Sequence, residues 1–140
     1  LGMKSAVLET DARGTFVGSS YLYATARDWA RMGQFLLQRG VWNGRSLLPL
    51  GYVDWMAEAH PASRGVYGRG HVWLSQPKIG LPGPNAKLPP DAFHAEGHDG
   101  QSVSIVPSEN LVVVRLGLTP NKLGYKPGHL IEAVIAALRD

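Results

Sequence analysis

Three side chains that could bind a metal ion or transfer protons lie close together in the segment FHAEGHDGQS, residues 93–102. His94, Glu96 and His98 occupy every second position, and alternate residues of a β-strand point to the same face. They could therefore offer two imidazoles and one carboxylate to a single ion. The set would span about 13 Å of one strand, however, and a compact metal site usually draws its ligands from more than one element. We therefore favour a polar strand face over a metal site.

The next two residues of the segment, Asp99 and Gly100, indicate a turn. Both residue types tolerate positive φ, so the pair predicts a two-residue hairpin turn between strands at 92–98 and 101–106. A turn of this kind is compatible with function, because a glycine lets the backbone approach a ligand closely and direct an N–H group at it.

Nucleophilic catalysis by a serine and a lysine requires both on successive turns of one helix, so that the amine can take the hydroxyl proton. The one Ser-x-x-Lys sequence begins at Ser75 and contains Pro77. Proline inside the motif makes that helix implausible, and we reject the match. The chain also lacks Tyr-x-Asn, Gly-x-Ser-x-Gly and phosphate-loop sequences, and it has no cysteine.

Hydrophobic periodicity predicts the helices that would position these residues. Thr25 and Asp28 form a capping pair before apolar residues at helical spacing, and Gly40 ends that pattern. Pro49 suits the first turn of a second helix, and an apolar face repeats near the C-terminus. The predicted helices cover 26–39, 49–59 and 127–138, and an Asn-Gly turn lies between the first two.

Short strand-like segments fill the middle of the chain, at 66–75, 92–98, 101–106 and 111–118. The proline-rich segment 77–90 reads as a long loop, and Pro-Ser-Glu-Asn forms a turn before the last strand. The order predicts an α+β fold, an antiparallel sheet of about four strands with helices packed on it. The last strand is apolar on both faces although it would lie at an edge, so we expect that another segment covers it.

The composition fits a single domain over residues 1–140, with 44% hydrophobic residues. The net charge of +3 comes from dispersed basic residues without interleaved aromatics, which disfavours nucleic acid as a partner. The apolar runs are far shorter than the roughly 20 residues of a membrane span. The first residues show no targeting signal, so a periplasmic and a cytoplasmic location both stay open.

Three blocks of the chain, taken in order, resemble the C-terminal part of the serine β-lactamase-like hydrolases. The blocks are GTFVGSSYLYATARDWARMGQFLLQRGVWNGRSLLP, YGRGHVWL and EGHDGQSVSIVPSENLVVVRLGL. This superfamily includes class C β-lactamases, penicillin-binding proteins, esterases and 6-aminohexanoate-dimer hydrolase. The likeness runs from Leu1 to about Leu118, and the combination of blocks carries it rather than any one block.

The resemblance implies a parent protein that hydrolyses an amide or ester through an acyl-enzyme, without a cofactor. It also implies that this chain is a fragment, because the Ser-x-x-Lys helix and the Tyr-x-Asn element of the family precede the equivalent of Leu1. We therefore expect the isolated chain to be catalytically inactive and to self-associate over its uncovered strand. A non-catalytic binding domain with the same fold is the alternative.

The resemblance places the third family motif, Lys/His-x-Gly, in the segment FHAEGHDGQS, and two registers are open. In the first, His98 and Gly100 are the motif residues, and Gln101 donates its N–H to the oxyanion. In the second, Ala95 and Gly97 are the motif residues, and the N–H of His98 is the donor. The second register leaves no cationic or imidazole group at the Lys/His position, which argues against ordinary β-lactamase activity.

The family also brings the loop before its first helix in this region near the cleft. The resemblance therefore implies substrate contacts from Ser19, Ser20 and Tyr21. Ordinary polar residues at a helix entry are an equally good interpretation of these positions.

Overall fold

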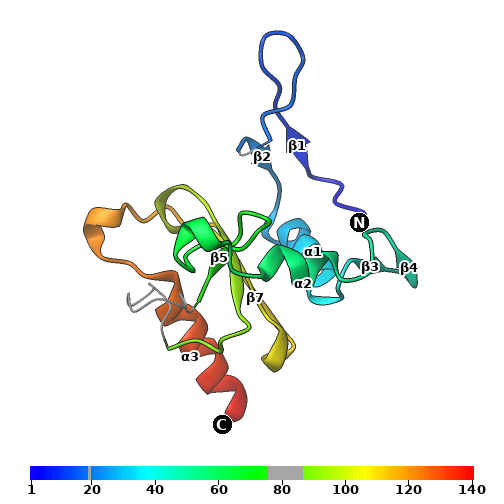
Figure 1. Cartoon of the computed structure of the whole chain (residues 1–140). Coiled ribbons are helices and arrows are strands. Elements are labelled where there is room, and N and C mark those ends of the chain that lie inside the picture. Colours follow the sequence, from blue (N-terminus) through cyan, green and yellow to red (C-terminus); the bar gives the residue numbers. More distant parts are fainter. Residues whose placement is uncertain (19, 76–86) are drawn as a thin grey trace.

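An antiparallel sheet with the order β5-β6-β7-β8 forms the centre of the computed structural model, which describes residues 1–18, 20–75 and 87–140 (Figure 1). Helices pack on both faces of this sheet, so the predicted α+β fold with a four-stranded antiparallel sheet is confirmed. The strands are β5 (Trp73–Leu74), β6 (Phe93–Glu96), β7 (Ser102–Val106) and β8 (Leu111–Arg115).

Helix α1 (Ala26–Leu37) covers β7 and β8 on one face of the sheet. The predicted cap is present, because Thr25 Oγ1 accepts a hydrogen bond from the N–H of Asp28. The buried Asp28 carboxylate accepts from the N–H and the hydroxyl of Ser5. These bonds lower the pKa of Asp28, the side-chain bond most, and they tie the N-terminal segment to the helix.

Gly33 allows α1 to lie directly against the sheet. A Cβ at this position would come within 2.5 Å of Val112 Cγ1 and 3.2 Å of Val103 Cγ1. The same face holds Phe93 and Ile105, both almost fully buried. The core on this side therefore depends on a close helix-to-strand approach that a larger residue at Gly33 would prevent.

Helix α3 (Pro127–Arg139) packs on the opposite face and agrees with the predicted helix at 127–138. Ile131 and Ile135 from α3 join Leu88, Ala92 and Val106 in a second buried cluster. No described helix has both the length and the apolar character needed to cross a membrane.

Helix α2 (Tyr52–Ala57) is shorter than the predicted 49–59. Gly51 precedes it with φ of +79°, in the left-handed region, so Pro49 lies outside the helix. Glu58 has extended angles and ends it. The left-handed conformation at Gly51 thus prevents the start that the proline predicted.

The predicted strand at 66–75 is wrong for most of its length, because only Trp73–Leu74 pair with β6. Gly68 and Gly70 turn the chain against α2 instead, and a Cβ on Gly70 would come within 1.9 Å of Met56 Cγ. The N–H of Gly70 donates to the carbonyl of Met56 at 3.0 Å. The glycines therefore serve a close packing contact rather than a strand.

Two small hairpins complete the described chain, together with short 3-10 turns at Pro61–Ser63, His98–Gly100, Pro107–Glu109 and Asn121–Leu123. Strands β3 (Val41–Trp42) and β4 (Arg45–Ser46) enclose the predicted Asn-Gly turn, in which Asn43 and Gly44 both have positive φ. Strands β1 (Val7–Leu8) and β2 (Leu22–Tyr23) belong to an arm that projects from the body in Figure 1.

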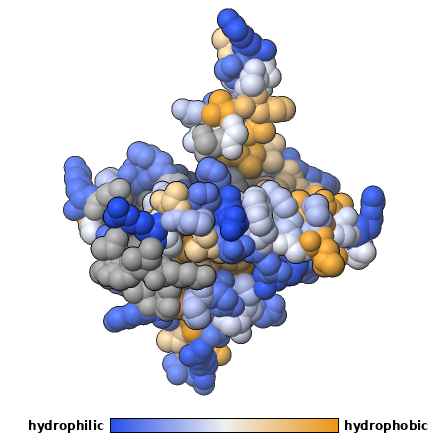
Figure 2. All heavy atoms as spheres, viewed as in Figure 1, coloured by the Kyte–Doolittle hydropathy of each residue, from blue (hydrophilic) through white to orange (hydrophobic). Residues whose placement is uncertain are grey.

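The arm carries apolar side chains on its surface, and Figure 2 shows them as an orange area above the body. Phe16 is 64% exposed and Val7 is 60% exposed. Strand β8 lies at the end of the strand order, as predicted, and its residues are all half-buried. The arm and the edge of β8 are the two surfaces that another polypeptide segment could cover.

Candidate functional site

The turn that joins β6 to β7 is the centre of the candidate site. The N–H of Gly97 donates to the carbonyl of Gln101 at 2.8 Å, and His98–Gly100 lie between them in a 3-10 turn. The connection is therefore one residue longer than the predicted two-residue turn. Asp99 and Gly100 have φ values of +55° and +77°, so the positive φ expected at both residues is confirmed.

His98 occupies the outer corner of this turn. Its side chain is 85% exposed and lies 3.2 Å, from Nε2 to Oδ2, from the carboxylate of Asp99. Its carbonyl accepts the N–H of Gln101 at 3.4 Å and the Nε2 of Gln101 at 3.1 Å. Within the described part of the chain, the N–H of His98 has no hydrogen-bond acceptor. The turn thus presents the N–H of His98 as an unengaged backbone donor at an exposed end of the sheet.

Strand β8 and the segment after it hold this turn from behind. The N–H of Thr119 donates to the carbonyl of Asp99 at 2.7 Å, and Arg115 Nη1 donates to the carbonyl of Gly100 at 2.8 Å. The sequence did not single out Arg115, because a basic residue at the end of an apolar strand looks like an ordinary surface charge. Only its three-dimensional contact with the carbonyl of Gly100 shows that it holds the turn.

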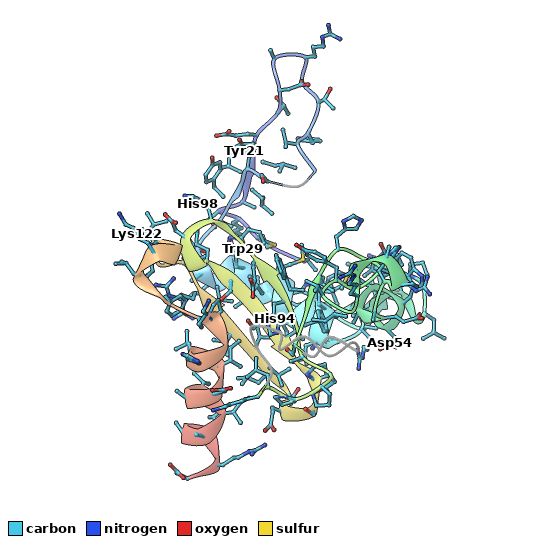
Figure 3. All side chains as sticks on the ribbon, turned by 60° about the vertical axis from the view of Figure 1, so that its left-hand side comes forward. Tyr21, Trp29, Asp54, His94, His98 and Lys122 are labelled. Carbon is cyan, nitrogen blue, oxygen red and sulfur yellow. The ribbon has the colours of Figure 1, made fainter. Side chains whose placement is uncertain are left out.

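The three residues of the metal hypothesis do not come together. His94 is fully buried on the sheet, Glu96 is half-buried, and His98 is exposed in the turn. Figure 3 shows His94 inside the body and His98 at the end of the sheet from which the arm projects. Among the described residues, no three His, Asp or Glu side chains are grouped closely enough to hold a metal ion. The alternate spacing therefore does not produce a common set of ligands.

His94 instead forms a buried polar pair with Ser75, whose Oγ lies 2.6 Å from His94 Nε2. Burial lowers the pKa of His94 to about 4, so the imidazole is neutral near pH 7. Ser104 is the cross-strand partner of His94 on β7, and it is also buried. His94 and Ser104 are therefore buried polar residues of this strand face, whereas Glu96 is only half-buried.

The position of Ser75 supports the rejection of the Ser-x-x-Lys match. Ser75 follows strand β5 and is fully buried against His94, so it is not on the exposed face of a helix. Pro77 and Lys78, the later residues of the match, lie outside the described residues.

The predicted substrate-contacting residues belong to the arm. Ser19 lies outside the described residues, and Ser20 and Tyr21 are exposed in the returning segment of the arm, just before β2. The carbonyl of Tyr21 accepts the N–H of Glu9 at 3.0 Å, within the arm. The arm and the turn at His98 lie toward the same end of the molecule (Figures 1 and 3), but no hydrogen bond links Ser20 or Tyr21 to the turn in the described part of the chain.

A hollow of about 360 Å³ lies elsewhere, between residues 87–89 and α3. Its lining includes Lys87, Pro89, Glu132 and Arg139, none of which belongs to the turn. The turn is therefore not part of the wall of this hollow.

Comparison with known proteins shows a likeness to solved structures. No protein-family model and no curated protein matches the chain. Among solved structures, the chain is similar to a "Putative 6-aminohexanoate-dimer hydrolase from Bacillus anthracis", with a TM-score of 0.71 and 24% sequence identity. The match covers 96% of this chain and 34% of that protein.

The two proteins share a fold. This likeness extends over nearly the whole described sheet and its helices, and it agrees with the α+β class predicted from the sequence. At 24% identity it establishes the fold alone, and the chain spans about a third of the length of the protein that it matches.

Proposed function

We propose that the chain is the C-terminal portion of a serine β-lactamase-like hydrolase that cleaves an amide or ester through an acyl-enzyme. The turn after β6 then supplies a backbone donor to the oxyanion of the tetrahedral intermediate. Two findings support the proposal: the fold is shared with a protein named as a hydrolase, and the turn offers an N–H that is not used within the described chain.

The unengaged N–H of His98 is the observation that carries this proposal. A donor that is fixed in place before the reaction stabilises developing negative charge without a reorganisation cost, and one such donor is typically worth about 3 to 4 kcal/mol in the transition state. The side chain of His98 is exposed, and among the described residues its polar contact is with Asp99. The backbone is therefore better placed than the imidazole for a fixed role.

The hydrogen bonds of the turn favour the register in which His98 is the donor. The N–H of Gln101 is directed to the carbonyl of His98, and the Gln101 side chain bonds to the same carbonyl. In this register Ala95 occupies the Lys/His position of the family motif and offers no charged group to a substrate carboxylate. We therefore propose an ester or a linear amide as the substrate class rather than a β-lactam.

The acylating serine is proposed to lie outside this chain. Ser75 begins the single Ser-x-x-Lys sequence, and its hydroxyl is buried against the His94 imidazole. A buried serine at the end of a strand cannot meet a substrate at the exposed turn. An oxyanion donor without a nucleophile gives little turnover, so the isolated chain is proposed to be inactive.

The test compares the longer protein that carries this sequence with the isolated chain. The longer protein should release a burst of nitrophenol from an activated nitrophenyl ester and should be labelled by a serine-directed phosphonate outside this chain. The isolated chain should do neither. Phosphonate-sensitive turnover by the isolated chain would contradict this division of roles, and a longer protein without any labelling would favour the non-catalytic binding domain.

A further inference from the structure

The contacts behind the turn at His98 converge on one side chain, Arg115 at the end of β8. Arg115 Nη1 donates to the carbonyl of Gly100 at 2.8 Å and to the carbonyl of Gly117 at 2.9 Å. Arg115 Nη2 donates to the hydroxyl of Thr119. One guanidinium thus connects the turn with the segment that follows β8.

Tyr125 supports the guanidinium from its other side. The Arg115 Cζ atom lies 4.0 Å from the centre of the Tyr125 ring, within the range of a cation–π contact. The hydroxyl of Tyr125 is buried and has no hydrogen-bond partner in the described part of the chain. The ring, rather than the hydroxyl, is therefore the part of Tyr125 that contributes to this arrangement.

The turn rests directly on this stack. A Cβ on Gly100 would come within 2.8 Å of Tyr125 Cδ1 and 3.1 Å of Arg115 Nη1, so the turn backbone fills the available space. The Asp99 carbonyl accepts the N–H of Thr119 at 2.7 Å. Two successive peptide groups of the turn are therefore fixed by the segment 115–125.

We propose that Arg115, stacked on Tyr125, is the positioning residue that fixes the orientation of the His98 N–H. This inference rests on the proposed function of the turn. Nη1 and Nη2 of Arg115 are both occupied by protein acceptors, so Arg115 acts through the turn rather than by binding substrate. A lysine would keep the positive charge, but it lacks the planar fork that reaches several acceptors at once.

Amide exchange in the 140-residue chain tests the positioning role without any assay of activity. Two N–H groups report on the turn. The N–H of Thr119 donates to the carbonyl of Asp99, and the N–H of Gly97 donates to the carbonyl of Gln101. In Arg115→Gln we expect both to exchange at least about tenfold faster, while the amides of β7 keep their wild-type rates. Arg115→Lys should show a smaller increase.

Tyr125→Phe is the matched control, because it keeps the ring and removes a hydroxyl without a described partner; its exchange rates should stay within about twofold of wild type. If Arg115→Gln does not fold, Thr119→Val removes the Nη2 acceptor alone and should still speed exchange at Gly97 by about threefold. Wild-type exchange at both reporters in a folded Arg115→Gln or Thr119→Val protein would overturn the proposal.

A second readout separates this inference from the proposed function. In the longer hydrolase, Arg115→Lys should lower kcat about tenfold with KM within about twofold, because the donor acts on the transition state. Faster amide exchange with wild-type kcat would leave Arg115 as the residue that orders the turn, and it would contradict the role of the turn in catalysis.

Discussion

Ser75 Oγ and His94 Nε2 lie 2.6 Å apart in the interior, where both side chains are fully buried. Burial lowers the pKa of His94 to about 4, because a buried imidazolium would lose its hydration. The pair is therefore a structural element that requires a neutral histidine.

The free energy of unfolding should depend on pH through His94. The unfolded chain takes up a proton near the ordinary pKa of 6.5, whereas the folded chain does so near 4. Stability should therefore fall as pH decreases from about 6.5 to about 4, by up to about 3 kcal/mol. Urea unfolding of the wild type and of His94→Gln at several pH values between 7.5 and 4 measures this effect. An equal pH dependence in both proteins would show that His94 is not responsible.

The close approach of α1 to the sheet predicts a steric penalty at Gly33. Gly33→Ala adds a Cβ within 2.5 Å of Val112 Cγ1, and overpacking of this kind costs about 1 to 3 kcal/mol. Val112→Ala removes the opposing atoms, so the double variant should show a favourable coupling in a double-mutant cycle of urea unfolding. Strict additivity of the two changes would argue against this contact.

The two glycines of the turn should respond differently to alanine. Gly100→Ala introduces strain at φ of +77° and a Cβ within 2.8 Å of Tyr125, which together should cost about 1 to 3 kcal/mol of stability. Gly97→Ala meets only ordinary contacts at 3.5 Å and beyond, so thermal unfolding should show a change within about 0.5 kcal/mol. Similar losses in both variants would contradict the turn geometry.

Self-association of the isolated chain also stays a prediction. Val7 and Phe16 of the apolar arm are more than half exposed. We expect the arm and the edge of β8 to contact a second copy of the chain. Light scattering at micromolar concentration should give a mass above the 15.1 kDa of one chain, and replacing Phe16 by serine should reduce it. A clean monomer for the wild type would refute this prediction.

Local sequence signals predicted the elements whose stabilising contacts are mainly local. The cap at Thr25, the apolar face of residues 127–138 and the positive-φ pair Asp99 and Gly100 each depend on neighbours along the chain. The strand that carries the turn was also predicted from its local pattern, at 92–98, and the structure has it at Phe93–Glu96. These features could be predicted because residue type and spacing determine them directly.

Features that depend on distant packing could not be predicted in the same way. The glycines at 68 and 70 are close to Met56, so a segment with a strand-like composition forms a turn. The burial of His94 depends on what covers that face of the sheet, which alternation along a strand does not show. The role of Arg115 depends on contacts with Gly100 and Tyr125, which residue type and spacing do not indicate.

We propose that the backbone N–H of His98 is the oxyanion donor, and His98→Pro removes this N–H together with the imidazole. Gly97 has extended angles, which suit the residue before a proline. The positive φ values of the turn are at Asp99 and Gly100 rather than at position 98, so position 98 can accept the proline φ. His98→Ala keeps the N–H and removes the imidazole, which makes it the matched control.

The decisive measurement is kcat for an activated ester in the proposed longer hydrolase with each of these two substitutions. We expect His98→Pro to lower kcat by about 100-fold or more and His98→Ala to stay within about threefold of wild type. An equal loss in both variants would assign the role to the imidazole, and a wild-type rate in His98→Pro would exclude the backbone donor; either result contradicts the claim.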